Sequence, residues 1–414
     1  MKFASFSLSA ALMLGVSAAS VQAKDLVVFQ SWSSPAEVAA LNVLHEAVAA
    51  EGIEWIDITI PHDTGSSVSL LNLVIGGQPP NIFSENNTGV YRDLTEMGLG
   101  RDLTEAFTES GAIDHFSDAV RNAITIDGEI RKMPLGVHID GMVYYNMDVA
   151  KAAGVDPNSW GSLEDMLADF DTITEAGYVP FAVGAQQWQI GYLTHALMAT
   201  LAGPEIYNQV YGLEPNAAAF DTPEVRSVFD WLRTFQQAAD EGSVNRDWNM
   251  TTNNVIAGQA LMQIHGDWMK GEWRAAGKEA GTDFGCIPIP GYRAVAVTVD
   301  GWGALGGQET DVDAAQMLFA KTVTDPVVNA KFASVKGATP VRNDVDMSGL
   351  DVCSQKVIEL LGDNARQVNN PSVTVDADWS NSIWEVAFNF WSDPQMSVDD
   401  AIATLHDQHD VIFN

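Results

Sequence analysis

Along the first part of this chain, the spacing of apolar residues alternates between the pattern of a β-strand and the pattern of an α-helix. A compact apolar run at 26–29 is typical of a buried strand, and apolar residues then recur at helical spacing from 35 to 50. A strand at 53–60, a helix at 66–75 and a short strand at 81–84 follow. Because strands and helices alternate, the pattern predicts a parallel sheet with helical crossovers.

A second alternating unit begins after a predicted hairpin turn at Asp127-Gly128. Its predicted strands lie at 137–138, 142–145, 179–184, 260–264, 284–289 and 294–299, and the later helices at 162–176, 192–201, 312–322, 326–333, 351–361 and 382–391, with a last helix from Ser397. We expect a glycine-rich turn at Gly301, directly after the strand at 294–299. No repeat or low-complexity linker separates the units, so we predict two interwoven α/β lobes.

Residues 1–23 have the pattern of a secretory signal peptide. An early Lys2 precedes an apolar stretch at 6–16, and small residues lead to Ala23. The apolar stretch is too short to cross a bilayer. The alternative, a buried helix, would carry polar residues on one face. No cysteine lies near the cleavage site to receive a lipid, so we expect an exported periplasmic protein without a lipid anchor.

Length and charge narrow the class further. The 414 residues exceed the size at which single cores stop growing, which favours two or more domains. A net charge of −34 makes nucleic acid and anionic membranes unlikely partners. The 55 acidic residues are dispersed along the chain, so two acids that are close in sequence carry no functional weight.

Cys286 and Cys353 are the only cysteines. An even pair in an oxidising compartment favours a disulfide, which we predict, and two separate buried thiols are the alternative. Two cysteines without a matching histidine pattern do not form a structural zinc site.

Motifs of catalysis are weak throughout the chain. The run from Gly301 to Gly306 matches the glycine pattern of dinucleotide sites, but no helix is predicted to open there. The His45-Glu46 pair lacks a second histidine four residues later, and His406 and His409 lack a third ligand. We therefore predict no catalytic residue, no metal and no cofactor.

Tryptophans are the more informative side chains. Five of the 12 have polar or glycine neighbours, and these are Trp32, Trp188, Trp268, Trp302 and Trp379. Each one alone could belong to a core. Together they favour a carbohydrate site, because a sugar ring has an apolar face that stacks on an aromatic ring and hydroxyls that need polar partners.

Several runs taken in order resemble the periplasmic sugar-binding proteins of ABC importers, within the glucose-type branch of extracellular solute-binding protein family 1. These runs are VVFQSWSSPAEVAAL, IGGQPPNIF, MPLGVHIDGMVYYN, AGQALMQIHGDWMKG, DFGCIPIPG and SVKGATPVR. The resemblance implies a type II-like periplasmic-binding-protein fold with two interwoven lobes and hinge crossovers. We expect one lobe at 24–136 plus about 300–345, and the other at about 137–299 plus 346–414.

The resemblance also implies a function and a set of site residues. It implies a monomeric receptor, not an enzyme, that holds a neutral sugar between the lobes for delivery to a membrane permease. The residues carried over from the family are Trp32, Glu37, Asn86, His138, Trp268, Asp300 and Lys336. To these we add Trp188, Asp378 and Trp379, whose neighbours are polar.

Two departures from the family pattern affect the expected sugar. Ser31 stands where glucose binders have a tryptophan, and the late loop at 369–372 has no histidine. A glycoside, a disaccharide or a modified sugar could replace glucose.

Two other functions remain open on the sequence alone. A secreted glycoside hydrolase would need two carboxyls, for which Glu37 and Asp300 are candidates. An amino-acid or oligopeptide receptor would need cations such as Lys336 and Arg342.

Overall fold

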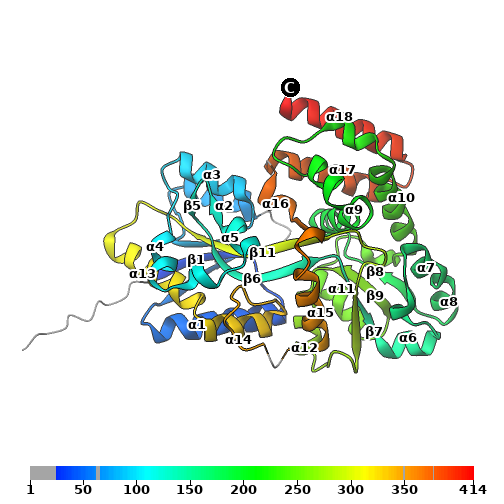
Figure 1. Ribbon diagram of the computed structural model, residues 1–414, viewed down its shortest axis with the longest axis horizontal. Coiled ribbons are helices and arrows are strands. Elements are labelled where there is room, and N and C mark those ends of the chain that lie inside the picture. Colours follow the sequence, from blue (N-terminus) through cyan, green and yellow to red (C-terminus); the bar gives the residue numbers. More distant parts are fainter. Residues whose placement is uncertain (1–24, 62–65, 348–349, 376) are drawn as a thin grey trace, which may run out of the picture.

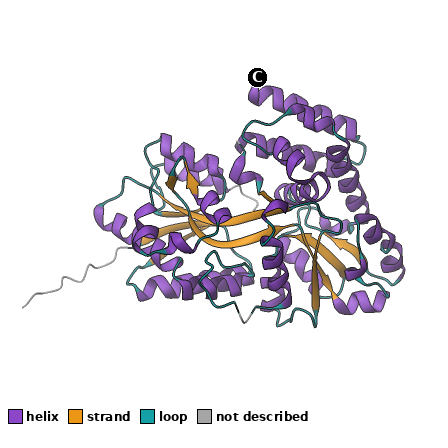
Figure 2. Ribbon diagram, in the orientation of Figure 1, coloured by secondary structure: helices purple, strands orange, loops and turns teal. Residues whose placement is uncertain are grey.

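The computed structural model describes residues 25–61, 66–347, 350–375 and 377–414. Two lobes lie side by side, each built from a β-sheet with helices packed on it (Figures 1 and 2). This arrangement confirms the predicted two-lobed α/β fold. The predicted signal peptide lies outside the described residues.

The first lobe contains the parallel sheet that the opening pattern predicts. Strand β1 (Leu26–Gln30) pairs in parallel with β2 (Trp55–Thr59) and with β3 (Ile82–Ser84). The helices α1 (Pro35–Ala50) and α2 (Ser66–Ile75) have the predicted bounds. Helix α1 begins where it does because Ser34 caps its first turn in a capping box and Pro35 occupies the first helical position.

Two long antiparallel strands connect the lobes, and we call this pair the crossover ribbon. Strand β6 (Met133–Asp140) pairs with β11 (Val295–Ala304) along most of their lengths (Figure 1). Strand β11 also pairs with β3 at one end and with β12 (Gln367–Asn369) at the other. The predicted turn at Gly301 is wrong, because β11 continues through Gly301 with a shift in register after Asp300.

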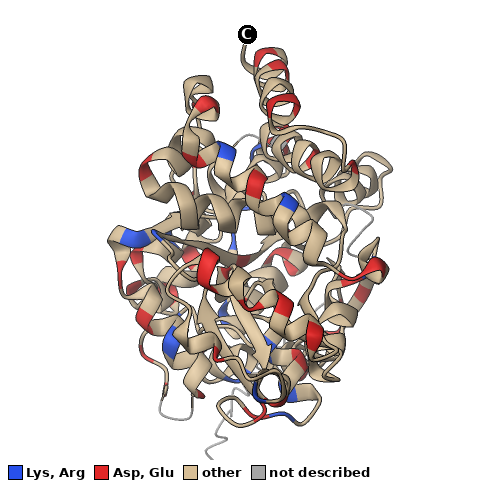
Figure 3. Ribbon diagram, turned by 90° about the vertical axis from the view of Figure 1, so that its right-hand side faces the viewer, with Lys and Arg blue, Asp and Glu red and all other residues tan. Residues whose placement is uncertain are grey.

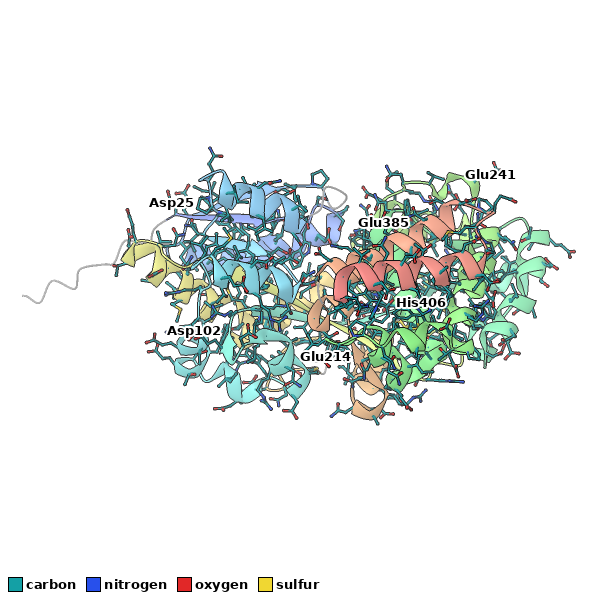
Figure 4. The ribbon with its side chains drawn as sticks, turned by 90° about the horizontal axis from the view of Figure 1, so that it is seen from above. Asp25, Asp102, Glu214, Glu241, Glu385 and His406 are labelled. Carbon is teal, nitrogen blue, oxygen red and sulfur yellow. A yellow bond between two sulfur atoms is a disulfide. The ribbon has the colours of Figure 1, made fainter. Side chains whose placement is uncertain are left out.

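The second lobe is built on a four-stranded sheet with the order β10-β7-β9-β8. Its strands are β7 (Met142–Asn146), β8 (Val179–Ala182), β9 (Ala260–His265) and β10 (Phe284–Pro288). Four long helices pack in this lobe: α9 (Gln187–Val210), α10 (Pro223–Ala238), α17 (Ala377–Ser392) and α18 (Val398–Phe413). Seen from above, α17 and α18 cover the second lobe, with Glu385 and His406 labelled on them (Figure 4).

Shorter elements complete the described chain. The predicted turn at Asp127-Gly128 joins β4 (Thr125–Ile126) to β5 (Glu129–Ile130), with φ of 51° and 86° at its two central residues. The other α-helices are α3 (Thr88–Glu96), α4 (Thr104–Glu109), α5 (Asp118–Ile124), α6 (Met147–Ala153), α7 (Leu163–Ala168), α8 (Phe170–Glu175), α11 (Trp248–Ile256), α12 (Met269–Ala275), α13 (Thr310–Val323), α14 (Pro326–Lys336), α15 (Val352–Leu361) and α16 (Pro371–Thr374).

Cys286 and Cys353 form a disulfide, as predicted. The bond ties the first turn of α15 to strand β10, so it joins two segments that are 67 residues apart in the chain.

Acidic residues occur in many separate parts of the ribbon and outnumber basic ones (Figure 3). None of the helices in the described ranges has both the length and the apolar character that a bilayer crossing requires.

Candidate ligand-binding site

A cavity of about 270 Å³ lies between the lobes, next to strand β11 of the crossover ribbon. We call it the central cavity. Side chains from both lobes and from the ribbon contribute to its walls. The lining residues are Ser31, Trp32, Glu37, Ser67, Ser84, Glu85, Asn86, Asn87, Trp188, Tyr192, Trp248, Trp268, Thr298, Asp300, Lys336, Ser372, Ser380, Asn381 and Trp384.

The wall from the second lobe is mainly aromatic. Its rings are Trp188 and Tyr192 of α9, Trp248 of α11, Trp268 after β9, and Trp384 of α17. The ring centroid of Tyr192 lies 5.7 Å from those of Trp188, Trp268 and Trp384. Tyr192 is therefore the centre of a cluster of rings whose faces and edges border the cavity.

The wall from the first lobe is polar apart from Trp32. The carboxylate of Glu37 accepts hydrogen bonds from the main-chain amides of Ser33 and Ser34, both at 3.0 Å. Its other oxygen lies 3.3 Å from Nζ of Lys336, at the end of α14. The same ammonium group lies 4.9 Å from the ring centroid of Trp32. The start of α1 thus fixes an aromatic ring, an acid and a cation beside one another.

The segment after β3 supplies a second polar group of side chains. Glu85 accepts hydrogen bonds from the Ser67 hydroxyl at 2.6 Å and from the Asn87 amide at 2.7 Å. Burial raises the pKa of Glu85 above its ordinary value, although these hydrogen bonds oppose the effect. A carboxyl, a hydroxyl and amides therefore border the cavity at this strand end.

A chain of four side chains joins the two lobes, and two of the four, Asn86 and Asp300, line the cavity. Asn86 donates to Asp300 Oδ1 at 3.3 Å, and Asp300 Oδ2 lies 3.1 Å from His138 Nε2. His138 Nδ1 lies 2.6 Å from Asp267 Oδ1. Burial opposes the positive charge on His138, but Asp267 and Asp300 outweigh it and raise the pKa of His138 to about 9. Burial likewise opposes the charge on Asp300, yet His138, Lys336 and Asn86 hold the pKa of Asp300 below its ordinary value.

A second buried network supports the ribbon beside Thr298. The carboxylate of Asp140 accepts hydrogen bonds from the Thr298 hydroxyl and from the Asn370 amide, each with a contact at 2.9 Å. The imidazole Nε2 of His195 lies at the same distance from Asp140. This network ties α9, β6, β11 and the late loop together at the back of the cavity.

Most of the site residues predicted from the sequence are brought together here. Seven of the ten line the central cavity: Trp32, Glu37, Asn86, Trp188, Trp268, Asp300 and Lys336. His138 is fully buried and lies behind Asp300. Asp378 and Trp379 do not belong to the lining.

Trp379 lies in the core of the second lobe because α17 begins at Ala377, five residues before the predicted helix. In this helix Trp379 and Ile383 share the buried face, and the Trp379 indole donates to the main-chain oxygen of Val210 at 2.9 Å. Ser380 and Trp384 lie on another face, which borders the cavity.

The sequence reasoning missed three aromatic residues of the cavity: Tyr192, Trp248 and Trp384. All three are in helices, whereas polar and glycine neighbours indicate tryptophans in loops. Helical spacing from Ser380 to Trp384 was the available signal. Trp302, by contrast, is fully buried in the first lobe, and its ring centroid lies 5.3 Å from that of Trp32.

Within the described residues, no group of three or more histidine, cysteine, aspartate or glutamate side chains is arranged to hold a metal ion.

Comparison with known proteins places this geometry in a family. Residues 56–351 match the family model of the bacterial extracellular solute-binding proteins. A probable sugar-binding periplasmic protein of Mesorhizobium japonicum is 30% identical over 345 residues, which cover 83% of this chain and 82% of that relative.

Two solved structures share the fold. A chitin oligosaccharide binding protein matches with a TM-score of 0.81 and 17% identity, covering 93% of this chain and 98% of the other. A bacterial solute receptor with an exclusive preference for β-D-galactopyranose matches with a TM-score of 0.80 and 17% identity, covering 94% and 100%.

Proposed function

This chain belongs to the bacterial extracellular solute-binding proteins, and we propose that it binds a neutral sugar of one or two rings in the central cavity for delivery to the permease of an ABC importer. Relatives and neighbours with names that specify sugars support this proposal. The predicted resemblance to solute-binding proteins is confirmed.

The observation that carries the proposal is that one wall of the cavity is aromatic and the other is polar. The second lobe contributes aromatic rings, among them Trp268 and Trp384, and the first lobe contributes hydroxyl, amide and carboxylate groups. A sugar ring needs both, because its apolar face stacks on aromatic rings while its hydroxyls donate to and accept from polar groups. The small volume of the cavity fits one or two rings.

The charges of the cavity favour a neutral ligand. Among the described residues that line the cavity, Lys336 is the only basic one, and its ammonium group already contacts Glu37. Arg342, the other cation considered for an anionic ligand, pairs with Asp344 outside the cavity. An amino-acid or peptide carboxylate would therefore lack a ready partner.

The hydrolase alternative is less well supported. Both oxygens of Asp300 have protein partners, one in Asn86 and one in His138. Both oxygens of Glu37 are also engaged, by amides at the start of α1 and by Lys336. A catalytic acid and a catalytic base or nucleophile need an oxygen directed at the substrate, so these carboxylates act more naturally as fixed hydrogen-bond acceptors.

The remaining parts of the proposal follow from the family. We place the protein in the periplasm as a monomer without a lipid anchor, with lobes at 24–136 plus about 300–345 and about 137–299 plus 346–414. Hinge motion about the crossover ribbon closes the lobes on the sugar. The protein acts as a receptor and not as an enzyme.

Isothermal calorimetry of the purified protein tests this function. The ligand set is D-glucose, D-galactose, D-xylose, maltose and cellobiose. At least one of them is expected to bind, and Trp32→Ala and Lys336→Ala should each weaken that binding sharply. Lys331→Ala is the matched control, because Lys331 is exposed on the same helix as Lys336. Release of free sugar from aryl glycosides, abolished by Glu37→Gln, would favour a hydrolase instead.

A further inference from the structure

Lys132 is buried next to the part of the central cavity that Glu85, Asn86 and Asn87 line, and we call this part the polar corner. Lys132 lies just before β6, its side chain is 1% exposed, and it is not part of the cavity lining. A buried ammonium group is costly unless it is well paired, so its contacts are informative.

The ammonium group of Lys132 binds the segment that follows β3. It donates to the main-chain oxygen of Asn86 at 2.7 Å and to the hydroxyl of Thr88 at 3.2 Å. It also lies 4.9 Å from the ring centroid of Tyr91, within reach of a cation–π contact. These contacts fix the main chain of the polar corner at Asn86 and the start of α3 at Thr88.

The aliphatic part of Lys132 packs against the register shift in β11. A β-carbon added at Gly301 would lie 3.0 Å from Cδ of Lys132, so the stem fills the space that the missing side chain leaves. One side chain therefore contacts both the segment after β3 and the irregular part of the crossover ribbon.

Asn86 joins the same two segments on the cavity side. Its Oδ1 accepts from the amide of Gly301 at 2.9 Å, and its Nδ2 donates to Asp300 at 3.3 Å. The orientation of Asp300 in the cavity thus depends on where the Asn86 main chain is held.

We propose that Lys132 is a positioning residue of the ligand site, which fixes the Asn86 main chain so that the Asn86 side chain can bridge Gly301 and orient Asp300. The inference rests on the proposed sugar-binding function. Lys132 acts on the ligand only through Asn86 and does not touch it. Burial lowers the pKa of Lys132 to about 7, while Glu85 favours the ammonium form and Arg92 opposes it.

A double-mutant cycle tests this role, with the best-bound sugar of the calorimetry set as the probe. Lys132→Met and Asn86→Ala are each expected to weaken binding at least tenfold. Because both residues act through the position of Asn86, their effects on affinity should not add. The double variant should bind the sugar no more than about twofold less tightly than the single variant with the lower affinity. Lys331→Met removes a charge of the same type from an exposed position and should bind like the wild type.

Two results would overturn the inference: sugar binding by Lys132→Met within twofold of the wild type, or a loss in the double variant equal to the product of the single losses. If Lys132→Met does not fold, Lys132→Gln replaces it in the same cycle.

A readout without sugar separates this inference from the proposed function. In protein labelled with ¹⁵N-asparagine, the side-chain signal of Asn86 is identified by its loss in Asn86→Ala. It should shift in Lys132→Met and not in Lys331→Met. An unmoved signal contradicts the inference, whereas a wild type that binds no sugar contradicts only the proposed function.

Discussion

The Nε2 atom of His138 lies 3.1 Å from Oδ2 of Asp300, across the two antiparallel strands that connect the lobes. Asp267 of the second lobe holds the other ring nitrogen, and Asn86 of the first lobe binds the other oxygen of Asp300. His138 therefore supports a cavity residue from behind, and it joins the two lobes through the crossover ribbon.

His138 should make the stability of the protein depend on pH in the alkaline range. Its pKa is about 9 in the folded protein and about 6.5 in an unfolded chain. Because the folded pKa is the higher one, the stabilisation is fully present below the unfolded pKa and is lost as pH rises through about 9. The difference corresponds to roughly 3 kcal/mol in the free energy of unfolding.

Urea unfolding of the wild type and of His138→Gln between about pH 6 and pH 10 checks this. The stability advantage of the wild type should shrink by roughly 3 kcal/mol over that range. Parallel curves for the two proteins would contradict the assignment of charge to His138.

Trp384 and Trp379, five residues apart on α17, should have opposite roles. Trp384→Ala removes a ring from the cavity wall and should weaken sugar binding about tenfold or more, since stacking contributes about 1 kcal/mol beyond the buried area. Trp379→Ala empties a core position and should lower the free energy of unfolding by about 3–5 kcal/mol. Calorimetry and urea unfolding of both variants measure the two effects, and the reverse pattern would show that the wrong ring was assigned to the site.

The sequence predicts the regular part of the fold well. Helix α1 has the predicted bounds because its signals are local: Ser34 caps it, Pro35 starts it and its apolar spacing is helical. The strand β11 was cut short at Gly301 because glycine usually marks a turn. Pairing with strands that are distant in sequence keeps this segment extended, and local patterns do not carry that information.

The candidate site is predictable only in part for the same reason. Trp32 lies just after the end of β1, and Asp300 lies at the register shift in β11. Both positions belong to motifs that are carried over from the family. Which side of a helix faces the cavity depends on how the lobes pack, so Trp379, which was predicted as a site residue with polar neighbours, lies on the buried face of α17 instead. His138 was expected to contact the ligand, but its ring is fully buried between Asp267 and Asp300 and is not part of the cavity lining.

Gly191 should be required for the position of Trp384. A methyl group at Gly191 on α9 would overlap the indole of Trp384. Gly191→Ala should therefore displace this ring and weaken sugar binding, although alanine itself favours a helix. In a Trp384→Ala background the same substitution should have no further effect on affinity. Calorimetry checks both variants.

Gly161→Ala is the matched control for Gly191→Ala, because its added methyl group would approach only one carboxylate oxygen of Asp165, at 3.3 Å, and no aromatic ring. Equal sugar affinity in the wild type and Gly191→Ala would show that the Trp384 indole adjusts without cost.

The disulfide should stabilise the protein without contributing to ligand binding. It closes a loop of 67 residues, for which chain entropy predicts about 4 kcal/mol, and neither cysteine lines the cavity. Urea unfolding of Cys286→Ser/Cys353→Ser should show this loss, with sugar affinity within twofold of the wild type. Wild type kept in reducing agent should behave like the double variant. A large loss of affinity would mean that α15 helps to shape the cavity.

Glu272 of α12 should join the two lobes beside the cavity. Its Oε1 accepts from the hydroxyl of Ser34 at 2.6 Å and from the amide of Ala36 at 3.1 Å, at the start of α1. Helix α12 also carries Trp273, which stacks on Phe284 in the second lobe, so the contact links one lobe to the other. The amide of Ala36 is one of the first-turn donors that have no partner within a helix, and the positive end of the helix dipole favours a carboxylate there.

Glu272→Ala should lower the free energy of unfolding by about 1.5–3 kcal/mol, the range for hydrogen bonds to a charged group. It should also weaken sugar binding, because Ser34 lies between two residues of the cavity wall, Trp32 and Glu37. Glu272→Gln keeps an acceptor at this position and should recover part of both losses. The exposed Glu279 on the following segment supplies the control Glu279→Ala, with neither effect expected. Urea unfolding and calorimetry give the two numbers, and a Glu272→Ala variant that matches the wild type in both would show that α12 and α1 touch without stabilising the approach of the lobes.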